Sequence, residues 1–131
     1  MFPRVALLLS SLLFAAAGLA FLLAPASMAA QVDLLAGSPT ALTDIRAIYG
    51  GLELGLACYL GLLLRRSERD PAQLELGLRA AIFALMGMAL ARLLGVALDG
   101  PQRAITWLLW SGELVGALLC GIGLRALARA R

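Results

Sequence analysis

The chain has 131 residues and a formal net charge of +3; 62% of the residues are apolar, 15% are charged, and the mean hydropathy is +0.92. An ordinary globular domain carries about 45–50% apolar and about 25% charged residues, so the excess apolar surface must face something other than a protein core, and we expect it to face lipid. Because the sequence contains no His, Lys or Asn, histidine ligation of metals or haem, lysine Schiff bases and Ser-His-Asp triads are excluded, and we expect no cofactor or metal.

Four apolar stretches are long enough to cross the hydrocarbon core of a bilayer, which is about 30 Å thick and needs around 20 helical residues. They predict an all-α fold in which residues 1–131 form a single domain, an antiparallel four-helix bundle in the membrane. The predicted helices cover about 5–24, 39–64, 71–98 and 104–124.

The first stretch also has features of a secretory signal, because Arg4 precedes it and small residues follow at Ala24 and Ala26. The apolar core of a signal is only about 7–15 residues long, whereas this stretch has the length of a full membrane span. We therefore predict that it is a membrane helix.

The next connections carry helix-start signals. In the long connection at 25–43, Ser38 and Pro39 have the pattern of an N-cap followed by a first helical turn. Asp70 predicts another N-cap, and Gln73 occupies the capping-box position three residues later. The second and third spans are therefore expected to begin at defined residues.

Two further features of the third span concern its surface and its end. Glu75 and Arg79 stand four residues apart in the favourable order for an ion pair on an exposed helix face. The sequence Asp-Gly-Pro-Gln-Arg at 99–103 predicts a tight turn, which makes the third and fourth helices antiparallel neighbours.

The arginines predict how the spans are oriented, because cytoplasmic loops of membrane proteins carry the excess of basic residues. Eight arginines fall on one side of the predicted spans, and only Arg46 and Arg103 fall on the other. We therefore predict a membrane protein whose N-terminus and C-terminus are both cytoplasmic. This basic rim is expected to contact anionic lipid, and no nucleic-acid partner is expected. The arginines on the predicted cytoplasmic side are Arg4, Arg65, Arg66, Arg69, Arg79, Arg125, Arg129 and Arg131.

Three ionisable residues fall at membrane depth, where each costs about 2.5–3.5 kcal/mol on insertion scales: Glu53, Arg92 and Glu113. Each glutamate stands twelve residues before an arginine of the predicted cytoplasmic rim, so both lie about 18 Å from that rim. Arg92 stands seven residues before Asp99, about 10 Å from the outer end of its helix. We therefore expect the two carboxylates and the guanidinium to converge in one layer.

The second span adds residues to this layer. Seven residues amount to almost two helical turns, so we expect Arg46 to stack over Glu53, with Tyr49 and Gly50 between them on that face. The glycines Gly50, Gly51 and Gly55 are expected to let a neighbouring helix approach closely. A second set of small residues, Cys58 and Cys120, is interpreted as small buried hydrophobes with free thiols.

Two interpretations of the charged layer remain open. In the first, Glu53, Arg92 and Glu113 form a buried ion-pair network that fixes the helix register. In the second, they line a polar pocket that opens to the outer leaflet and binds a cation, a proton or a small ligand. Arg46, Tyr49 and Asp99 could belong to this pocket or be anchors at the membrane interface.

The segments DIRAIYGGLELG (44–55), ARLLGVALDGP (91–101) and SGEL (111–114) resemble the bacterial four-helix membrane proteins of the domain of unknown function 4345 family. The resemblance covers nearly the whole chain in length and helix count. It implies a four-helix fold in a bacterial inner membrane, and it supplies no activity. The positions that match the family pattern are Asp44, Arg46, Tyr49, Gly50, Gly51, Glu53, Arg92, Asp99, Gly100 and Glu113.

Three functions are compatible with these observations. The leading hypothesis is a binding or transport protein that holds a small polar or amphipathic ligand, such as a lipid, at the Glu53, Arg92 and Glu113 layer. The alternative is an accessory subunit of a larger membrane complex, or a homo-oligomer, in which these charges are structural. The third is an enzyme that acts on a lipid-soluble substrate, with Glu53 or Glu113 as general acid or base.

Overall fold

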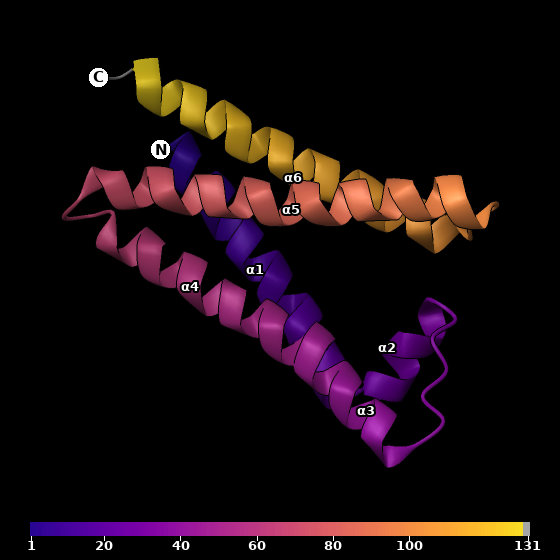
Figure 1. The fold of residues 1–131 in the computed structure, drawn as a ribbon. Helices are drawn as coiled ribbons and strands as arrows, with labels where there is room; N and C mark the ends of the chain where they lie inside the picture. The colour runs from indigo at the N-terminus through magenta and orange to yellow at the C-terminus, as the bar shows by residue number, and fades with distance from the viewer. Residues whose placement is uncertain (130–131) are drawn as a thin grey trace. The chain divides into compact units, whose positions relative to one another are not determined.

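The computed structural model describes residues 1–129, and Arg131 of the predicted basic rim lies outside them. The described chain is all-helical and contains no strand, which confirms the all-α part of the predicted fold (Figure 1). In chain order the elements are α1 (Phe2–Leu23), α2 (Pro25–Gln31), α3 (Pro39–Ile45), the π-helical segment η1 (Arg46–Gly51), α4 (Leu52–Arg66), α5 (Pro71–Asp99) and α6 (Ala104–Arg129).

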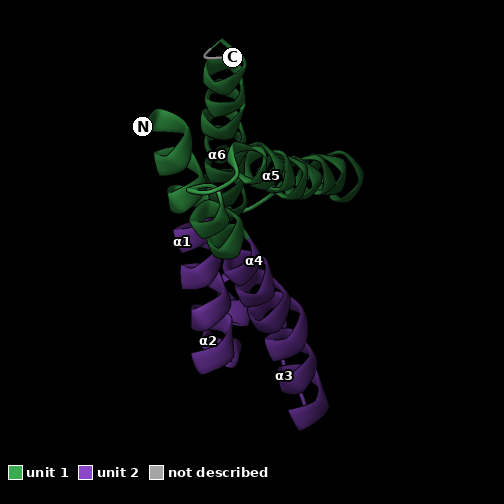
Figure 2. Ribbon diagram, turned by 90° about the vertical axis from the view of Figure 1, so that its left-hand side faces the viewer, with its two compact units in different colours: residues 1–10, 60–131 green, residues 11–59 purple. Residues whose placement is uncertain are grey.

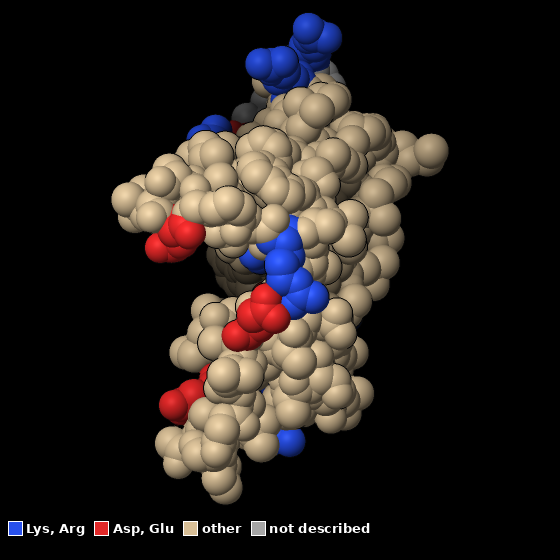
Figure 3. All heavy atoms as spheres, turned by 90° about the vertical axis from the view of Figure 1, so that its right-hand side faces the viewer, with Lys and Arg blue, Asp and Glu red and all other residues tan. Residues whose placement is uncertain are grey.

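Four helical segments are long and apolar enough to cross a membrane, as the composition predicts. They are Phe2–Leu23, Pro39–Arg66, Pro71–Asp99 and Ala104–Arg129. Figure 3 shows one face of the molecule, on which charged side chains are few and most of the surface is neither acidic nor basic. The long helices therefore have the lengths and the surface that a bilayer requires.

The structure differs from the sequence prediction at the end of the last helix and in the connection after the first span. The last helix continues to Arg129 instead of ending near 124, because its terminal residues are Arg, Ala and Leu, which are strong helix formers. The long connection contains the short helix α2, which begins with Pro25 in its first turn. Apolar periodicity cannot reveal a helix of so few residues.

Side-chain caps start α3 and α5 where the sequence places them. The hydroxyl of Ser38 accepts the backbone N–H of Ala41 at 3.1 Å, and a carboxylate oxygen of Asp70 accepts that of Ala72 at 3.0 Å. The amide of Gln73 donates to the second carboxylate oxygen of Asp70 at 2.8 Å, instead of reaching the backbone as a capping box would. The hydrogen bonds from Gln73 and Ala72 lower the pKa of Asp70 below its ordinary value.

The described residues form two compact units (Figure 2). Unit 1 contains residues 1–10 and the described residues from 60 onward, and unit 2 contains residues 11–59. The antiparallel bundling of all four spans into one domain stays a prediction.

In unit 1, α5 and α6 lie side by side along much of their length (Figure 1). The tight turn between them begins at Gly100, whose φ of 84° is a conformation that glycine adopts without strain. Leu78, Leu85 and Cys120 are buried in this unit. Arg4 pairs with Glu68 at 3.0 Å on its exposed surface.

In unit 2, the second part of α1 packs directly against η1 and the start of α4. A Cβ built on Gly18 would lie 2.8 Å from the backbone nitrogen of Leu54 and 2.9 Å from the carbonyl oxygen of Gly50. The hydroxyl of Ser11 donates to the carbonyl of Ala57 at 2.9 Å. The two helices therefore approach until their backbones touch, which only glycine at position 18 permits.

The two cysteines are free thiols, but the predicted burial of Cys58 is wrong. Cys120 is fully buried and its sulfur lies 3.3 Å from the hydroxyl of Ser10. Cys58 is exposed, because it falls on the side of α4 away from Ala57 and Leu60, which are buried. Exposure of an apolar side chain is expected where a helix faces lipid.

This difference predicts different thiol reactivity. A membrane-permeant maleimide should modify Cys58 in the folded protein and should reach Cys120 only after unfolding. Peptide mass spectrometry before and after denaturation measures the two rates. Cys58→Ser should abolish labelling of the folded protein, and rapid labelling of Cys120 in that variant would contradict the observed burial.

Candidate functional site

The candidate site lies in unit 1, where Arg92 of α5 faces Glu113 of α6. The guanidinium Nε of Arg92 donates to Oε1 of Glu113 at 2.8 Å. The Glu113 side chain is only 8% exposed, whereas that of Arg92 is 31% exposed. The pair is therefore a charge-assisted hydrogen bond with a buried acceptor and a partly accessible donor.

The second carboxylate oxygen of Glu113, Oε2, does not take part in the contact with Arg92. Oε2 is buried, and no residue within 1–129 donates a hydrogen bond to it. Buried polar atoms almost always have a partner, and a carboxylate without one retains a full acceptor site. The pair thus presents an unused acceptor beside a guanidinium.

The local sequence of α6 explains why Glu113 is pressed against α5. Gly116 lies almost one turn along the same helix, and a Cβ built there would lie 2.9 Å from Cδ1 of Leu85. Gly116 and Glu113 are both buried, so they share the face that packs on α5. The small residue lets the helices approach and brings the carboxylate within reach of Arg92.

Glu53, the third predicted member of the layer, belongs to unit 2. It lies in the first turn of α4, directly after the π-helical segment. Its convergence with Arg92 and Glu113 stays a prediction.

Arg46 and Tyr49 also belong to unit 2, where both contact the C-terminal end of α1. The Nε of Arg46 donates to the carbonyl of Leu22 at 3.2 Å, and the ring of Tyr49 stacks on Phe21 with centroids 5.2 Å apart. The last carbonyls of a helix have no partner inside the helix, so a guanidinium stabilises that end by hydrogen bonding and by charge. Both side chains therefore have a structural role.

The π-helical segment removes the basis for stacking Arg46 over Glu53. A π turn pairs residues i and i+5, so it holds one residue more than an α turn. One extra residue displaces the following side chains by about 100° around the helix axis. The expected stacking of Arg46 over Glu53 depends on an uninterrupted α-helix between them. Their spacing of seven residues therefore does not place them on one face.

The three predicted packing glycines differ in their surroundings. A Cβ on Gly50 would lie 2.8 Å from Cγ of Leu22, whereas one on Gly51 would have only the Arg46 carbonyl oxygen nearby, at 3.7 Å. A Cβ on Gly55 would meet no described atom within 4 Å. Close packing therefore requires glycine at position 50, and a packing role of Gly55 stays a prediction.

Asp99 ends α5, is exposed and lies with its Oδ2 3.6 Å from a Cβ built on Gly95. The rings of Trp107 and Trp110 meet edge to face near the start of α6, with centroids 6.0 Å apart. Throughout the described part of the chain, no cluster of acidic or cysteine side chains could hold a metal ion.

Fold and site together define a class: an all-helical protein with four helices long and apolar enough to span a membrane and a part-buried Arg–Glu pair between two of them. The family model described as a domain of unknown function (DUF4345) matches residues 2–124. The chain belongs to this family. No curated protein and no solved structure matches it.

Proposed function

We propose that the protein is inserted in the bacterial inner membrane by its four long helices, with both termini in the cytoplasm. The lengths and compositions of the four segments support insertion. The excess of arginines near the two termini and in the loop between α4 and α5 supports the orientation.

Reporter fusions test this orientation. Alkaline phosphatase fused after Arg131 should be inactive, and the same enzyme inserted within 37–40 should be active, because it folds only outside the cytoplasm. Green fluorescent protein at the same positions should give the opposite pattern. Activity after Arg131 would overturn the proposed orientation.

We propose further that the protein binds a small polar or amphipathic ligand at the Arg92–Glu113 pair, entering from the outer leaflet. The observation that carries this proposal is the buried Oε2 of Glu113, which accepts no hydrogen bond from the described residues. A hydroxyl or amine of a ligand would satisfy that oxygen, and an anionic group would be attracted by the partly exposed guanidinium.

Native mass spectrometry of the protein extracted in mild detergent tests this site. The wild type should carry a small-molecule adduct that dissociates on collisional heating, and Glu113→Gln should lose it, because the amide replaces one acceptor by a donor. Glu68→Gln is the matched control, since it removes a carboxylate from an exposed ion pair, with Arg4, outside the proposed site. An adduct of the same mass that persists in Glu113→Gln would place this ligand elsewhere, whereas a phospholipid adduct of different mass would not bear on this site.

A second candidate is an accessory subunit or homo-oligomer, favoured by the surroundings of Gly55. This glycine is exposed beside Leu52 and Tyr59, which are also exposed. Small residues on an outward face let another membrane helix approach closely. Gly55→Leu should then shift the protein to a smaller species in size-exclusion chromatography with light scattering, and an unchanged mass would count against this role.

A further inference from the structure

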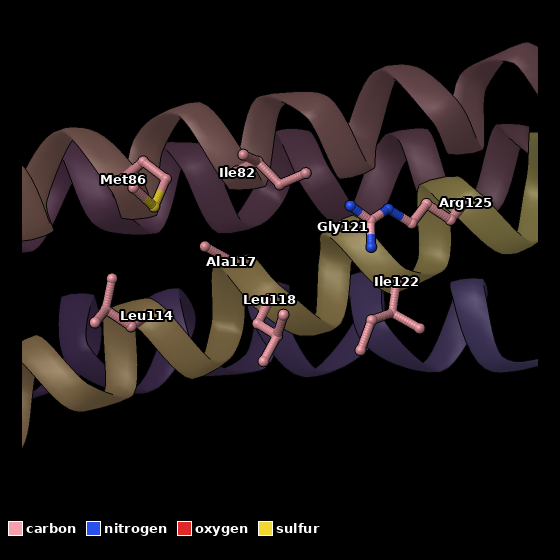
Figure 4. Close-up of a pocket in the computed structure, with 8 residues that line it drawn as sticks. All are labelled: Ile82, Met86, Leu114, Ala117, Leu118, Gly121, Ile122 and Arg125. Atoms are coloured by element: carbon pink, nitrogen blue, oxygen red, sulfur yellow. The ribbon is translucent and has the colours of Figure 1, made fainter.

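An apolar groove runs along the outside of unit 1 between α5 and α6 (Figure 4). Its volume is about 330 Å³, at the lower end of the roughly 300–1,000 Å³ typical of small-molecule sites. Ile82 and Met86 line it from α5, and Leu118 and Ile122 line it from α6. Its surface is therefore suited to a hydrocarbon chain.

Gly121 keeps the groove open along α6. A Cβ built at this position would meet no atom of the described chain within 4 Å. Figure 4 shows the guanidinium of Arg125 reaching back over Gly121, at the end of the groove. One charged group thus stands at the end of an otherwise apolar groove.

Arg125 also lines a second hollow, of about 270 Å³, on its other side. Arg79 and Glu75 line this hollow too, and they form an ion pair with each other at 2.6 Å. Two guanidinium groups and one carboxylate give the hollow a net positive charge, and no acidic side chain of residues 1–129 forms an ion pair with Arg125. An anionic headgroup complements this charge, whereas an ammonium group would be repelled.

The length of the groove matches one leaflet of a bilayer. Leu114 lines one end and Arg125 the other, and eleven helical residues span about 16 Å. Half of a hydrocarbon core of about 30 Å is about 15 Å. Lipid in a leaflet would therefore reach from the hollow at Arg125 to the depth of Leu114.

We propose that unit 1 binds an anionic phospholipid of the cytoplasmic leaflet, with one acyl chain in the groove and the phosphate at Arg125. This inference rests on the proposed insertion and orientation, which place Arg125 at the cytoplasmic rim. Basic pockets between membrane helices on that side suit anionic headgroups. The site is separate from the Arg92–Glu113 pair.

Native mass spectrometry of the full chain in detergent, titrated with phosphatidylglycerol or phosphatidylethanolamine of identical acyl chains, tests the proposal. The wild type should retain phosphatidylglycerol in preference to phosphatidylethanolamine. Arg125→Ala should weaken phosphatidylglycerol binding about fivefold, the effect expected for one arginine at an anionic headgroup. Gly121→Leu should weaken the binding of both lipids, because it fills the groove.

Two variants serve as controls. Arg129→Ala removes the same charge one turn further along α6, outside both hollows, and should bind phosphatidylglycerol like the wild type. Gly112→Leu adds the same volume as Gly121→Leu where a Cβ also meets no described atom within 4 Å, and it should bind like the wild type.

Equal effects of Arg125→Ala and Arg129→Ala would overturn the proposal, because they would indicate attraction to the rim as a whole. Unaltered lipid binding by Gly121→Leu would also overturn it. So would a change from dimer to monomer in Gly121→Leu without loss of lipid, because the groove would then bind a second protein chain. The reporter fusions test the proposed orientation independently, because they report on which side of the membrane each position lies and involve no lipid. A failure of lipid binding can therefore be distinguished from a wrong orientation.

Discussion

Arg92→Ala should lower the thermal stability of the purified protein in detergent more than Arg4→Ala or Arg79→Ala, which break exposed ion pairs. Glu113 would keep a buried carboxylate but lose the guanidinium that now stands 2.8 Å away. Removing one member of a buried pair typically costs about 3–5 kcal/mol, because the remaining charge is left uncompensated. The unfolding transition, followed by intrinsic tryptophan fluorescence or by thiol exposure at Cys120, measures the loss.

Two further variants separate the buried charge from other effects. Glu113→Gln should be milder, because its amide oxygen can still accept the Nε hydrogen bond and Arg92 is partly exposed. Arg79→Ala breaks the exposed pair with Glu75, for which about 0.3–0.5 kcal/mol is usual. If Arg92→Ala unfolds with the wild type, the pair is not a structural element and the proposed ligand site loses its support.

Gly18→Ala should be the most damaging small substitution in unit 2. Adding a methyl group to a helical glycine ordinarily stabilises a helix by about 0.5–1 kcal/mol. At position 18 that methyl group would lie 2.8 Å from the Leu54 backbone nitrogen and 2.9 Å from the Gly50 carbonyl oxygen. Backbone atoms cannot rotate aside as a side chain can, so overpacking, at about 1–3 kcal/mol or more, outweighs the helical gain.

Gly55→Ala is the matched control for Gly18→Ala. It makes the same chemical change on α4, where an added Cβ meets no described atom within 4 Å. Its unfolding temperature should equal or exceed that of the wild type. The prediction for Gly18 fails if both variants unfold at the same temperature, because that result would show that α1 and α4 can move apart without loss of stability.

Apolar length and helix-start residues were sufficient to predict most of the fold. The four long segments follow from composition, and Ser38 and Asp70 cap helices as their sequence context indicates. The π-helical segment Arg46–Gly51 was not predictable, because no residue type requires it. Its residues contact α1, which is distant in sequence.

The candidate site was only partly accessible from the sequence. The depth of Arg92 and Glu113 in their helices, and the tight turn after Asp99 that makes those helices neighbours, predict the contact that the structure shows at 2.8 Å. Gly18 was missed, since a lone glycine in an apolar helix has no distinguishing pattern. The need for glycine at position 18 arises from the close approach of the second span at Gly50, so it is visible only when the packing of the two helices is known.

The extra residue of η1 makes the helix from Pro39 to Arg66 sensitive to its residue count. Deleting one residue from this segment would let the backbone return to regular α-helical pairing, with every hydrogen bond still formed. The part before the deletion would then turn by about 100° relative to α4 and advance by about 1.5 Å. Arg46 would then lose its hydrogen bond to the Leu22 carbonyl, and Tyr49 would lose its stacking on Phe21. The contacts that hold the end of α1 therefore depend on the number of residues in η1 as well as on their identity.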